Sequence, residues 1–202
     1  MMKNKLRLAT IMASVFFIGG ALVACNQTEP VAATEATTTT DGGQTTPAAA
    51  AITENEIREA QVAWGEGLVA ISTAYAEGDD YATIAQSVLD TLYGYVDGPV
   101  LFKPTIASEV PFRFTEAQAA SYFIGGSISE DDGFALSPWT DVRFSDDGMF
   151  IFNGDTALWM GSVYLTDGDG EEIRVEKSKG YYRDANGDIR LQLHHSSVPF
   201  SN

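Results

Sequence analysis

Apolar side chains recur at helical spacing in three stretches of the chain, which predicts three helices. Thr53 and Glu56 have the spacing of a capping box at the start of the first helix, and Thr115 is a candidate cap for the third. Short apolar runs between the second and third helices predict two short strands. The predicted helices cover residues 53–77, 81–93 and 115–123, and the short strands cover residues 100–103 and 110–114.

From Pro138 onward the pattern changes from helical spacing to strict alternation, which predicts five antiparallel strands. Asp-Gly and Asn-Gly sequences, which favour tight turns, separate them. The predicted strands cover residues 142–144, 149–152, 156–165, 172–183 and 188–197. Helices followed by a meander of strands indicate an α+β domain, with the helices on one face of a curved sheet.

The first 51 residues differ in character from this domain. Three basic residues precede an uncharged apolar stretch, and Leu22-Val23-Ala24-Cys25 resembles the lipobox of bacterial lipoproteins. We therefore predict a lipoprotein signal peptide over residues 1–24 and a lipid on Cys25; a plain signal peptide or an uncleaved anchor is the alternative. Residues 25–51 contain almost no large apolar side chain and predict a disordered tether. The domain would then cover residues 52–202 and lie in the bacterial cell envelope, anchored to the membrane by its lipid and facing the periplasm or the exterior.

Charge and cysteine content narrow the range of partners and cofactors. The chain has 28 Asp and Glu against 12 Lys and Arg, and such an acidic surface repels nucleic acid. Cys25 is the only cysteine, so neither an internal disulfide nor a cysteine-ligated zinc site can form. The acidic loops 167–171 and 184–188 lack the full calcium-loop pattern and are typical of hairpin turns. We expect no metal and no other cofactor.

The order of the predicted elements resembles that of the nuclear-transport-factor-2-like (NTF2-like, or SnoaL-like) superfamily. Local sequences agree: Gly78-Asp79-Asp80-Tyr81 is similar to the junction of its first two helices, and Leu101-Phe102-Lys103-Pro104 to its first strand. The run His194-His195-Ser196-Ser197 resembles the final hairpin of the calmodulin-dependent-kinase association domain, the most similar type. The resemblance implies a cone of three helices packed on a curved mixed or antiparallel sheet, with an open pocket. It also implies a homodimer formed through the outer face of the sheet.

The same resemblance and the alternation of strand residues suggest which residues line the pocket. His195 shares a strand face with Leu191 and Leu193, so we expect it on the pocket side and His194 on the opposite side. In the association domain, the position matching His195 carries a basic pocket residue. A hydrogen-bonded structural histidine is the alternative reading.

Other candidate ligand-binding residues are charged or aromatic. Lys103 and Arg113 lie on the short strands that border the pocket in this fold, although charges on edge strands also discourage unwanted pairing. The aromatic candidates, which would otherwise be core residues, are Trp64, Tyr75, Tyr122 and Trp139.

No motif for a nucleophile, a phosphate loop or a zinc protease is present, and His195 with Glu176 forms no clear acid–base pair. We therefore expect a membrane-tethered module that binds a small molecule or mediates assembly, without defined catalytic residues. The alternative is a cofactor-free enzyme of the SnoaL-like isomerase, dehydratase or hydrolase kind. Relatives with similar sequences sometimes carry the name phosphoribosyl-AMP cyclohydrolase, but that chemistry requires cysteine-ligated zinc.

Overall fold

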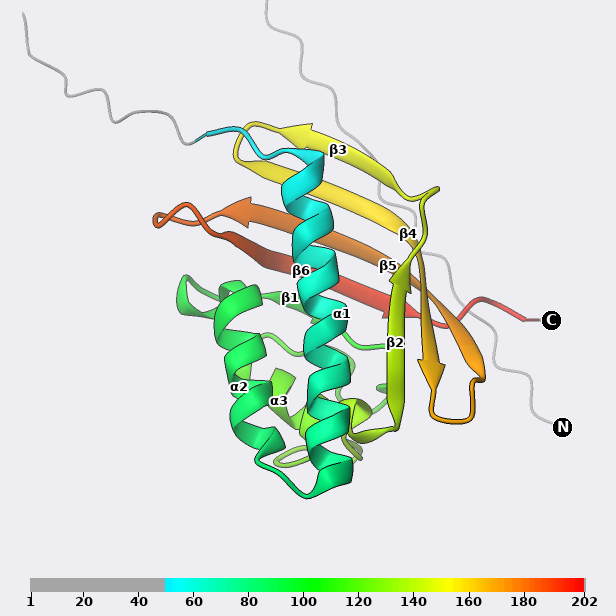
Figure 1. Ribbon diagram of the computed structural model, residues 1–202. Helices are drawn as coiled ribbons and strands as arrows, with labels where there is room; N and C mark the ends of the chain where they lie inside the picture. The colour runs from blue at the N-terminus through cyan, green and yellow to red at the C-terminus, as the bar shows by residue number, and fades with distance from the viewer. Residues whose placement is uncertain (1–49, 202) are drawn as a thin grey trace, which may run out of the picture. The chain divides into compact units, whose positions relative to one another are not determined.

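The computed structural model describes residues 50–201 (Figure 1). The predicted signal peptide, Cys25 and nearly all of the predicted tether lie outside these residues. Among the helices described, none combines the length and the apolar character needed to cross a membrane.

Three helices form where the sequence predicts them: α1 (Glu54–Glu77), α2 (Tyr81–Leu92) and α3 (Glu116–Ile124). The capping box at α1 is confirmed, since the Thr53 side chain accepts a hydrogen bond from the Glu56 backbone and the Glu56 carboxylate accepts one from Thr53. Two short 3-10 turns, η1 (Gly94–Val96) and η2 (Phe134–Leu136), follow α2 and α3.

The strands form one mixed sheet with the order β1-β6-β5-β4-β2, and β3 pairs with the other half of the long strand β4. β1 runs parallel to β6, and every other pair in the described sheet is antiparallel. The strands are β1 (Leu101–Lys103), β2 (Trp139–Phe144), β3 (Met149–Asn153), β4 (Thr156–Asp167), β5 (Glu172–Arg183) and β6 (Ile189–Ser197). The predicted α+β class, with three helices on a mixed sheet, is confirmed.

The predicted strand over residues 110–114 is wrong, because this segment forms no strand. The Glu130 carboxylate accepts hydrogen bonds from the backbone N–H groups of Ser108, Glu109 and Val110 at 2.7–2.9 Å. The chain leading into the predicted strand, and the Val110 amide at its start, are therefore held by a side chain and not by a neighbouring strand. Only the Arg113 N–H reaches β1, where it donates to the Phe102 carbonyl.

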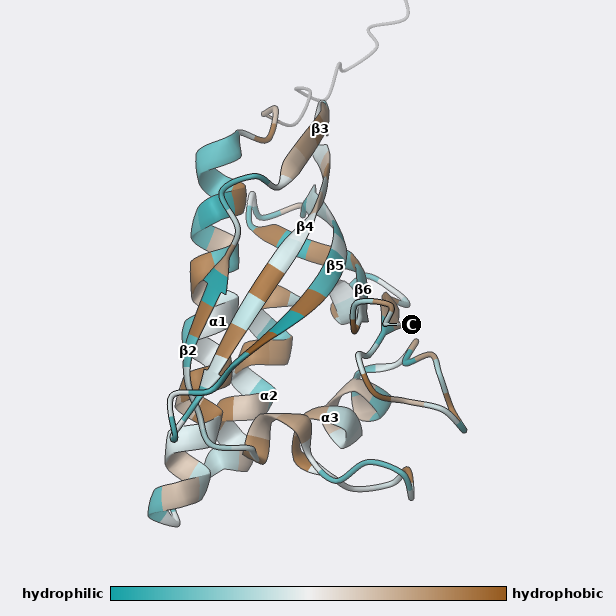
Figure 2. Cartoon of the chain, turned by 90° about the vertical axis from the view of Figure 1, so that its right-hand side faces the viewer, coloured by the Kyte–Doolittle hydropathy of each residue, from teal (hydrophilic) through white to brown (hydrophobic). Residues whose placement is uncertain are grey.

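The helices cover one face of the curved sheet, and α1 runs along it (Figure 1). Apolar and polar bands follow one another along β4 and β5 (Figure 2). Buried residues alternate with more exposed ones on both strands, so one side of each strand packs under the helices. On β4, Trp159 and Val163 are buried on the helix side, while Leu158 and Met160 are exposed on the other. Gly65 lets α1 approach β2 closely, since a Cβ there would lie 3.0 Å from the Val142 Cβ.

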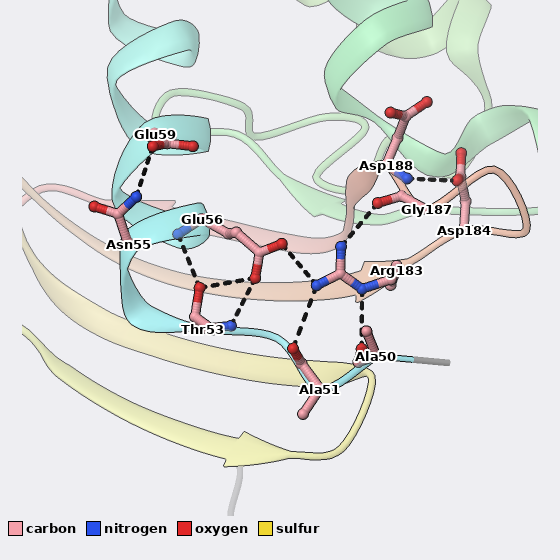
Figure 3. A network of polar contacts seen from close by, with 10 residues as sticks. All are labelled: Ala50, Ala51, Thr53, Asn55, Glu56, Glu59, Arg183, Asp184, Gly187 and Asp188. Carbon is pink, nitrogen blue, oxygen red and sulfur yellow. Dashed lines mark hydrogen bonds and ion pairs between the residues drawn. The ribbon is translucent and has the colours of Figure 1, made fainter. Parts of the chain in front are cut away.

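Arg183, at the end of β5, connects the start of the domain to the sheet through hydrogen bonds and an ion pair (Figure 3). Its guanidinium donates to the Ala50 carbonyl at 3.0 Å and to the Gly187 carbonyl at 2.8 Å, and forms a 2.7 Å ion pair with Glu56. One side chain thus joins the first turn of α1 to the β5–β6 hairpin, which fixes α1 across the sheet.

Candidate functional site

Strand β5 turns two lysines into the protein interior. Val175, Lys177, Lys179 and Tyr181 alternate along the strand, and all four are buried. Lys177 is 3% exposed and Lys179 is 1% exposed. Buried lysines are uncommon because removing an ammonium group from water is costly, so two of them on one face mark an unusual interior.

The two histidines of β6 point in the opposite sense to the prediction. His194 is buried at 1% exposure, whereas His195 lies on the outer face of the sheet. The cause is a β-bulge: Gly180 pairs with Leu193 and Tyr181 pairs with Leu191, which leaves Gln192 as an extra residue. Leu191 faces the core, but the bulge reverses the alternation after it. The expectation that His195 lies on the pocket side is therefore wrong.

His194 is one link in a continuous chain of polar side chains that crosses the interior. The Trp64 indole N–H donates to the Tyr93 hydroxyl at 2.9 Å, and that hydroxyl lies 2.9 Å from His194 Nδ1. On the other side of the imidazole, His194 Nε2 lies 3.2 Å from Lys177 Nζ. Lys177 donates to the Ser196 hydroxyl at 3.1 Å, and Ser196 lies 2.7 Å from the Thr105 hydroxyl. We call these six residues the polar chain.

Burial changes the protonation of the polar chain. Desolvation lowers the pKa of Lys177 to about 7, so a large fraction of its amine is uncharged near neutral pH. Desolvation, reinforced by the two lysines, also holds the pKa of His194 well below its usual value. The imidazole stacks on Phe102, with ring centres 4.9 Å apart, and meets the edge of Trp64. An uncharged base thus lies among aromatic rings and hydroxyl groups.

Tyr122 on α3 stands beside the Thr105 end of the polar chain. Burial raises the pKa of its phenol to about 12, so the hydroxyl keeps its proton at physiological pH. The hydroxyl faces Thr105 and Ile106 but makes no hydrogen bond of good geometry. A buried donor in this state is available to a bound molecule. Tyr122 also borders a pocket of about 270 Å³, whose rim includes Tyr75 and the acidic residue Asp131.

The remaining predicted site residues are spread over other parts of the domain. Lys103 and His195 border a groove on the outer side of the sheet, although Lys103 Nζ reaches the Ser196 carbonyl at 3.0 Å. Arg113 is fully buried and forms a 2.8 Å ion pair with Asp131. Trp139 donates its indole N–H to the Phe134 carbonyl within the core. Of the predicted set, Trp64 belongs to the polar chain, Tyr122 stands beside it, and Lys103 touches it only through the Ser196 backbone carbonyl.

The sequence-based prediction missed most of the polar chain: Tyr93, Thr105, Lys177, His194 and Ser196. A usable signal existed for Lys177, because it alternates with Val175 and Tyr181 on the apolar face of a long predicted strand. No comparable pattern marks Thr105, which follows the short strand β1 and is placed by tertiary contacts alone.

Within residues 50–201, no group of three or more His, Asp or Glu side chains is arranged to hold a metal ion. In each acidic loop one carboxylate accepts hydrogen bonds within the turn itself. Asp167 accepts from the backbone of Asp169 and Glu171, and Asp184 accepts from that of Asn186 and Asp188. The polar groups that the candidate site offers to a bound molecule are amine, imidazole and hydroxyl groups.

Comparison with known proteins identifies a family whose model spans the stretch of the chain that carries this site. The family model described as metal-independent carbonic anhydrase matches residues 55–198. The metal-independent carbonic anhydrase of Nostoc sp. (strain PCC 7120) is 48% identical over 155 residues, which are 74% of this chain and 75% of that protein. The crystal structure of a cyanobacterial iota-carbonic anhydrase complexed with bicarbonate is 44% identical, with a TM-score of 0.73, and the match covers 75% of this chain and 95% of that one.

The structural neighbours also include NTF2-like proteins. A putative dehydratase of the NTF2-like family from Streptomyces avermitilis is 12% identical, with a TM-score of 0.46, over 73% of this chain and 96% of its own length. Kinase association domains are among these neighbours, but the association-domain type is not the family that matches. The expectation of a non-catalytic binding or assembly module is contradicted by the 48% identity to an enzyme.

Proposed function

Because the chain belongs to the metal-independent carbonic anhydrase family, we propose that its domain catalyses the reversible hydration of carbon dioxide to bicarbonate and a proton. The observation that carries this proposal is the position of Lys177. Its amine contacts a hydroxyl on one side and an imidazole on the other, and burial lowers its pKa to about 7. A base with a pKa near the working pH is suited to accept a proton from water.

The reaction requires that a water molecule lose a proton as its oxygen bonds to the carbon of carbon dioxide. Ser196 and Thr105 present two hydroxyls 2.7 Å apart, which can hold this water by donating and accepting hydrogen bonds. Lys177 then takes the proton, directly or through the Ser196 hydroxyl, and becomes an ammonium ion. Its return to the amine, with release of the proton to solvent, completes the cycle without any change in the covalent structure of the protein.

Negative charge develops on the oxygens of carbon dioxide as bicarbonate forms. The Tyr122 hydroxyl, protonated and without a partner of good geometry, is placed to donate a hydrogen bond to one of these oxygens. The protonated Lys177 adds a positive charge nearby. Carbon dioxide itself is apolar, and the aromatic rings of Phe102 and Phe123, stacked 5.8 Å apart, form part of an apolar wall.

Adjacent serines on β6 provide a matched test of this site. Ser196 is buried in the polar chain, whereas Ser197 occupies the next position and points to the other face. We expect Ser196→Ala and Lys177→Met to lower the rate of carbon dioxide hydration by roughly 100-fold or more. Ser197→Ala should stay within about twofold of wild type.

The measurement is stopped-flow hydration with a pH indicator, on the purified chain with and without a chelator. The wild-type rate should rise with pH through about 7, as Lys177 loses its proton, and should not change with the chelator. Full activity in Lys177→Met, or equal losses in the two serine variants, would show that the reaction takes place elsewhere.

A further inference from the structure

The polar chain begins behind His194 with two residues, Trp64 and Tyr93, whose polar atoms make no hydrogen bond to Lys177 or to the Ser196 and Thr105 hydroxyls. Trp64 and Tyr93 are 2% and 1% exposed, and their hydrogen bonds connect α1 and the end of α2 to the imidazole. Tyr93 also packs against Tyr95 and Phe102. Buried polar groups of this kind restrict one another, because each donor needs an acceptor.

The direction of the hydrogen bonds along this part of the chain is fixed by chemistry. An indole N–H can only donate, so the Tyr93 oxygen accepts from Trp64. Among the described residues, the remaining partner for the Tyr93 proton is His194 Nδ1, 2.9 Å away. Nδ1 is then an acceptor, and a neutral His194 must carry its proton on Nε2.

This tautomer has a consequence for Lys177. The Nε2–H group points at Lys177 Nζ, 3.2 Å away, and a nitrogen can accept that hydrogen bond only through a lone pair. The amine has a lone pair and the ammonium ion has none. Protonation of Lys177 would require His194 to move its proton to Nδ1, which would leave the buried Tyr93 hydroxyl without an acceptor.

We propose that Trp64 and Tyr93 are positioning residues that hold His194 in the Nε2–H tautomer and thereby favour the unprotonated amine of Lys177; the hydrogen bond from His194 to this amine breaks when Lys177 accepts the proton. The inference builds on the proposed function, since the proton in question comes from the water that attacks carbon dioxide. Their hydrogen bonds reach Lys177 only through His194, although the Trp64 ring also faces the amine at 4.7 Å.

The surroundings of Lys177 agree with an uncharged amine. None of the ion pairs among the described residues includes Lys177. From α1 it faces the Trp64 ring at 4.7 Å, and its register partner on β4 is Gly161, so neither element supplies a charge. The other titratable groups near it are Lys179 on β5, His194 and His195 on β6, Lys103 on β1, and the phenols of Tyr93 and Tyr122.

The first test needs no substitution. Nitrogen-15 NMR of histidine-labelled wild-type protein distinguishes a protonated ring nitrogen from an unprotonated one, and we expect His194 to carry its proton on Nε2 at pH 8. A proton on Nδ1 would overturn the inference. The result is independent of activity, so the inference can fail while the proposed function stands, and the reverse also holds.

The second test removes the Tyr93 hydroxyl. In Tyr93→Phe, His194 Nδ1 has no hydrogen-bond partner in either tautomer. Moving the imidazole proton from Nε2 to Nδ1 then costs no hydrogen bond to Tyr93, so protonation of Lys177 becomes easier. We expect the acid limb of the kcat/KM profile to move upward by roughly one pH unit, with the high-pH plateau retained. Trp64→Phe should move the limb in the same direction by less, since the Tyr93 hydroxyl remains.

Tyr95→Phe is the matched control, because Tyr95 stacks on Tyr93 but donates its hydrogen bond to the Arg113 carbonyl. Its acid limb should coincide with that of wild type. A loss of plateau activity in Tyr93→Phe without movement of the limb would show a structural role only and would overturn the inference. Movement of the limb in Tyr95→Phe as large as in Tyr93→Phe would do the same.

Discussion

Lys179 is a buried lysine whose amine makes no hydrogen bond in the described structure. Its Nζ lies 4.3 Å from the centre of a Trp64 ring and 4.7 Å from that of Phe144. Desolvation, and then repulsion from Lys177, hold its pKa well below the usual value. The folded domain therefore carries an uncharged amine that would bind a proton in the unfolded chain. This difference destabilises the fold at neutral pH.

Replacing Lys179 with methionine should stabilise the domain. Between the folded and unfolded pKa values the unfolded chain binds more protons, so the stability of the wild type rises as the pH increases toward 10.5. Lys179→Met lacks this term. We expect its free energy of unfolding to exceed that of the wild type by at least about 1 kcal/mol at pH 7, and the difference to shrink at pH 10. Denaturant unfolding at both pH values measures it, and a constant difference would contradict the explanation.

Alternation along a strand predicts side-chain direction only where the strand is regular. It indicates correctly that Lys177 shares a face with Val175, because β5 is continuous between them. The alternation fails for His195, because the extra residue Gln192 of the bulge lies between the core residue Leu191 and the histidine. Nothing in the local sequence marks that bulge, and the resulting error inverts the two histidines.

The ends of the helices could be predicted to within one residue because their signals are local. Thr53 with Glu56, and Thr115 with Gln118, form their capping boxes within one turn. The segment 110–114 is the contrary case. Its apolar pattern favours a strand, but an acceptor 20 residues away, the Glu130 carboxylate, binds the backbone N–H of Val110.

The candidate site is assembled from the ends of elements that lie far apart in the sequence. The parallel pairing of β1 with β6 aligns Phe102 with His194, and the chain leaving β1 then brings Thr105 to Ser196. Helix α3 supplies Tyr122 from the opposite side. The residue types could be read from the sequence, but their convergence follows from a strand pairing that no local pattern specifies. This is why the sequence indicated the fold and not the chemistry.

At the scale of the whole molecule, the predicted lipid at Cys25 would determine where in the cell the domain is located. The lipobox-like sequence Leu22-Val23-Ala24-Cys25 predicts attachment to a membrane outside the cytoplasm. We expect Cys25→Ala to shift the protein from the membrane fraction to the soluble fraction or to leave it unprocessed, with the specific activity of the domain unchanged. The test compares wild type and Cys25→Ala in a bacterial host, by separating membrane and soluble fractions and by measuring the electrophoretic mobility of the chain. Unchanged fractionation and mobility would refute lipidation.

The outer face of the sheet is the surface most suited to join two copies of the chain. Met149 pairs with Met160 and Ile151 pairs with Leu158, and these four apolar side chains are 52–74% exposed on the side away from the helices. An exposed apolar group of this kind is typical of an interaction surface. In a dimer with a twofold axis at this face, the four apolar side chains of each copy would pack against the same four of the other, so both surfaces would be buried.

We therefore expect a chain that begins at Asn26 to be a dimer at micromolar concentration, and Met160→Glu to make it monomeric. A charge at Met160 would be buried against its symmetry mate in the dimer, whereas in the monomer it stays in water. Val62→Glu is the control, since Val62 is equally apolar and 58% exposed but lies on α1, away from the outer face of the sheet. Light scattering with each variant measures the mass. A monomeric wild type, or a dimer that persists in Met160→Glu, would show that this surface does not join two copies.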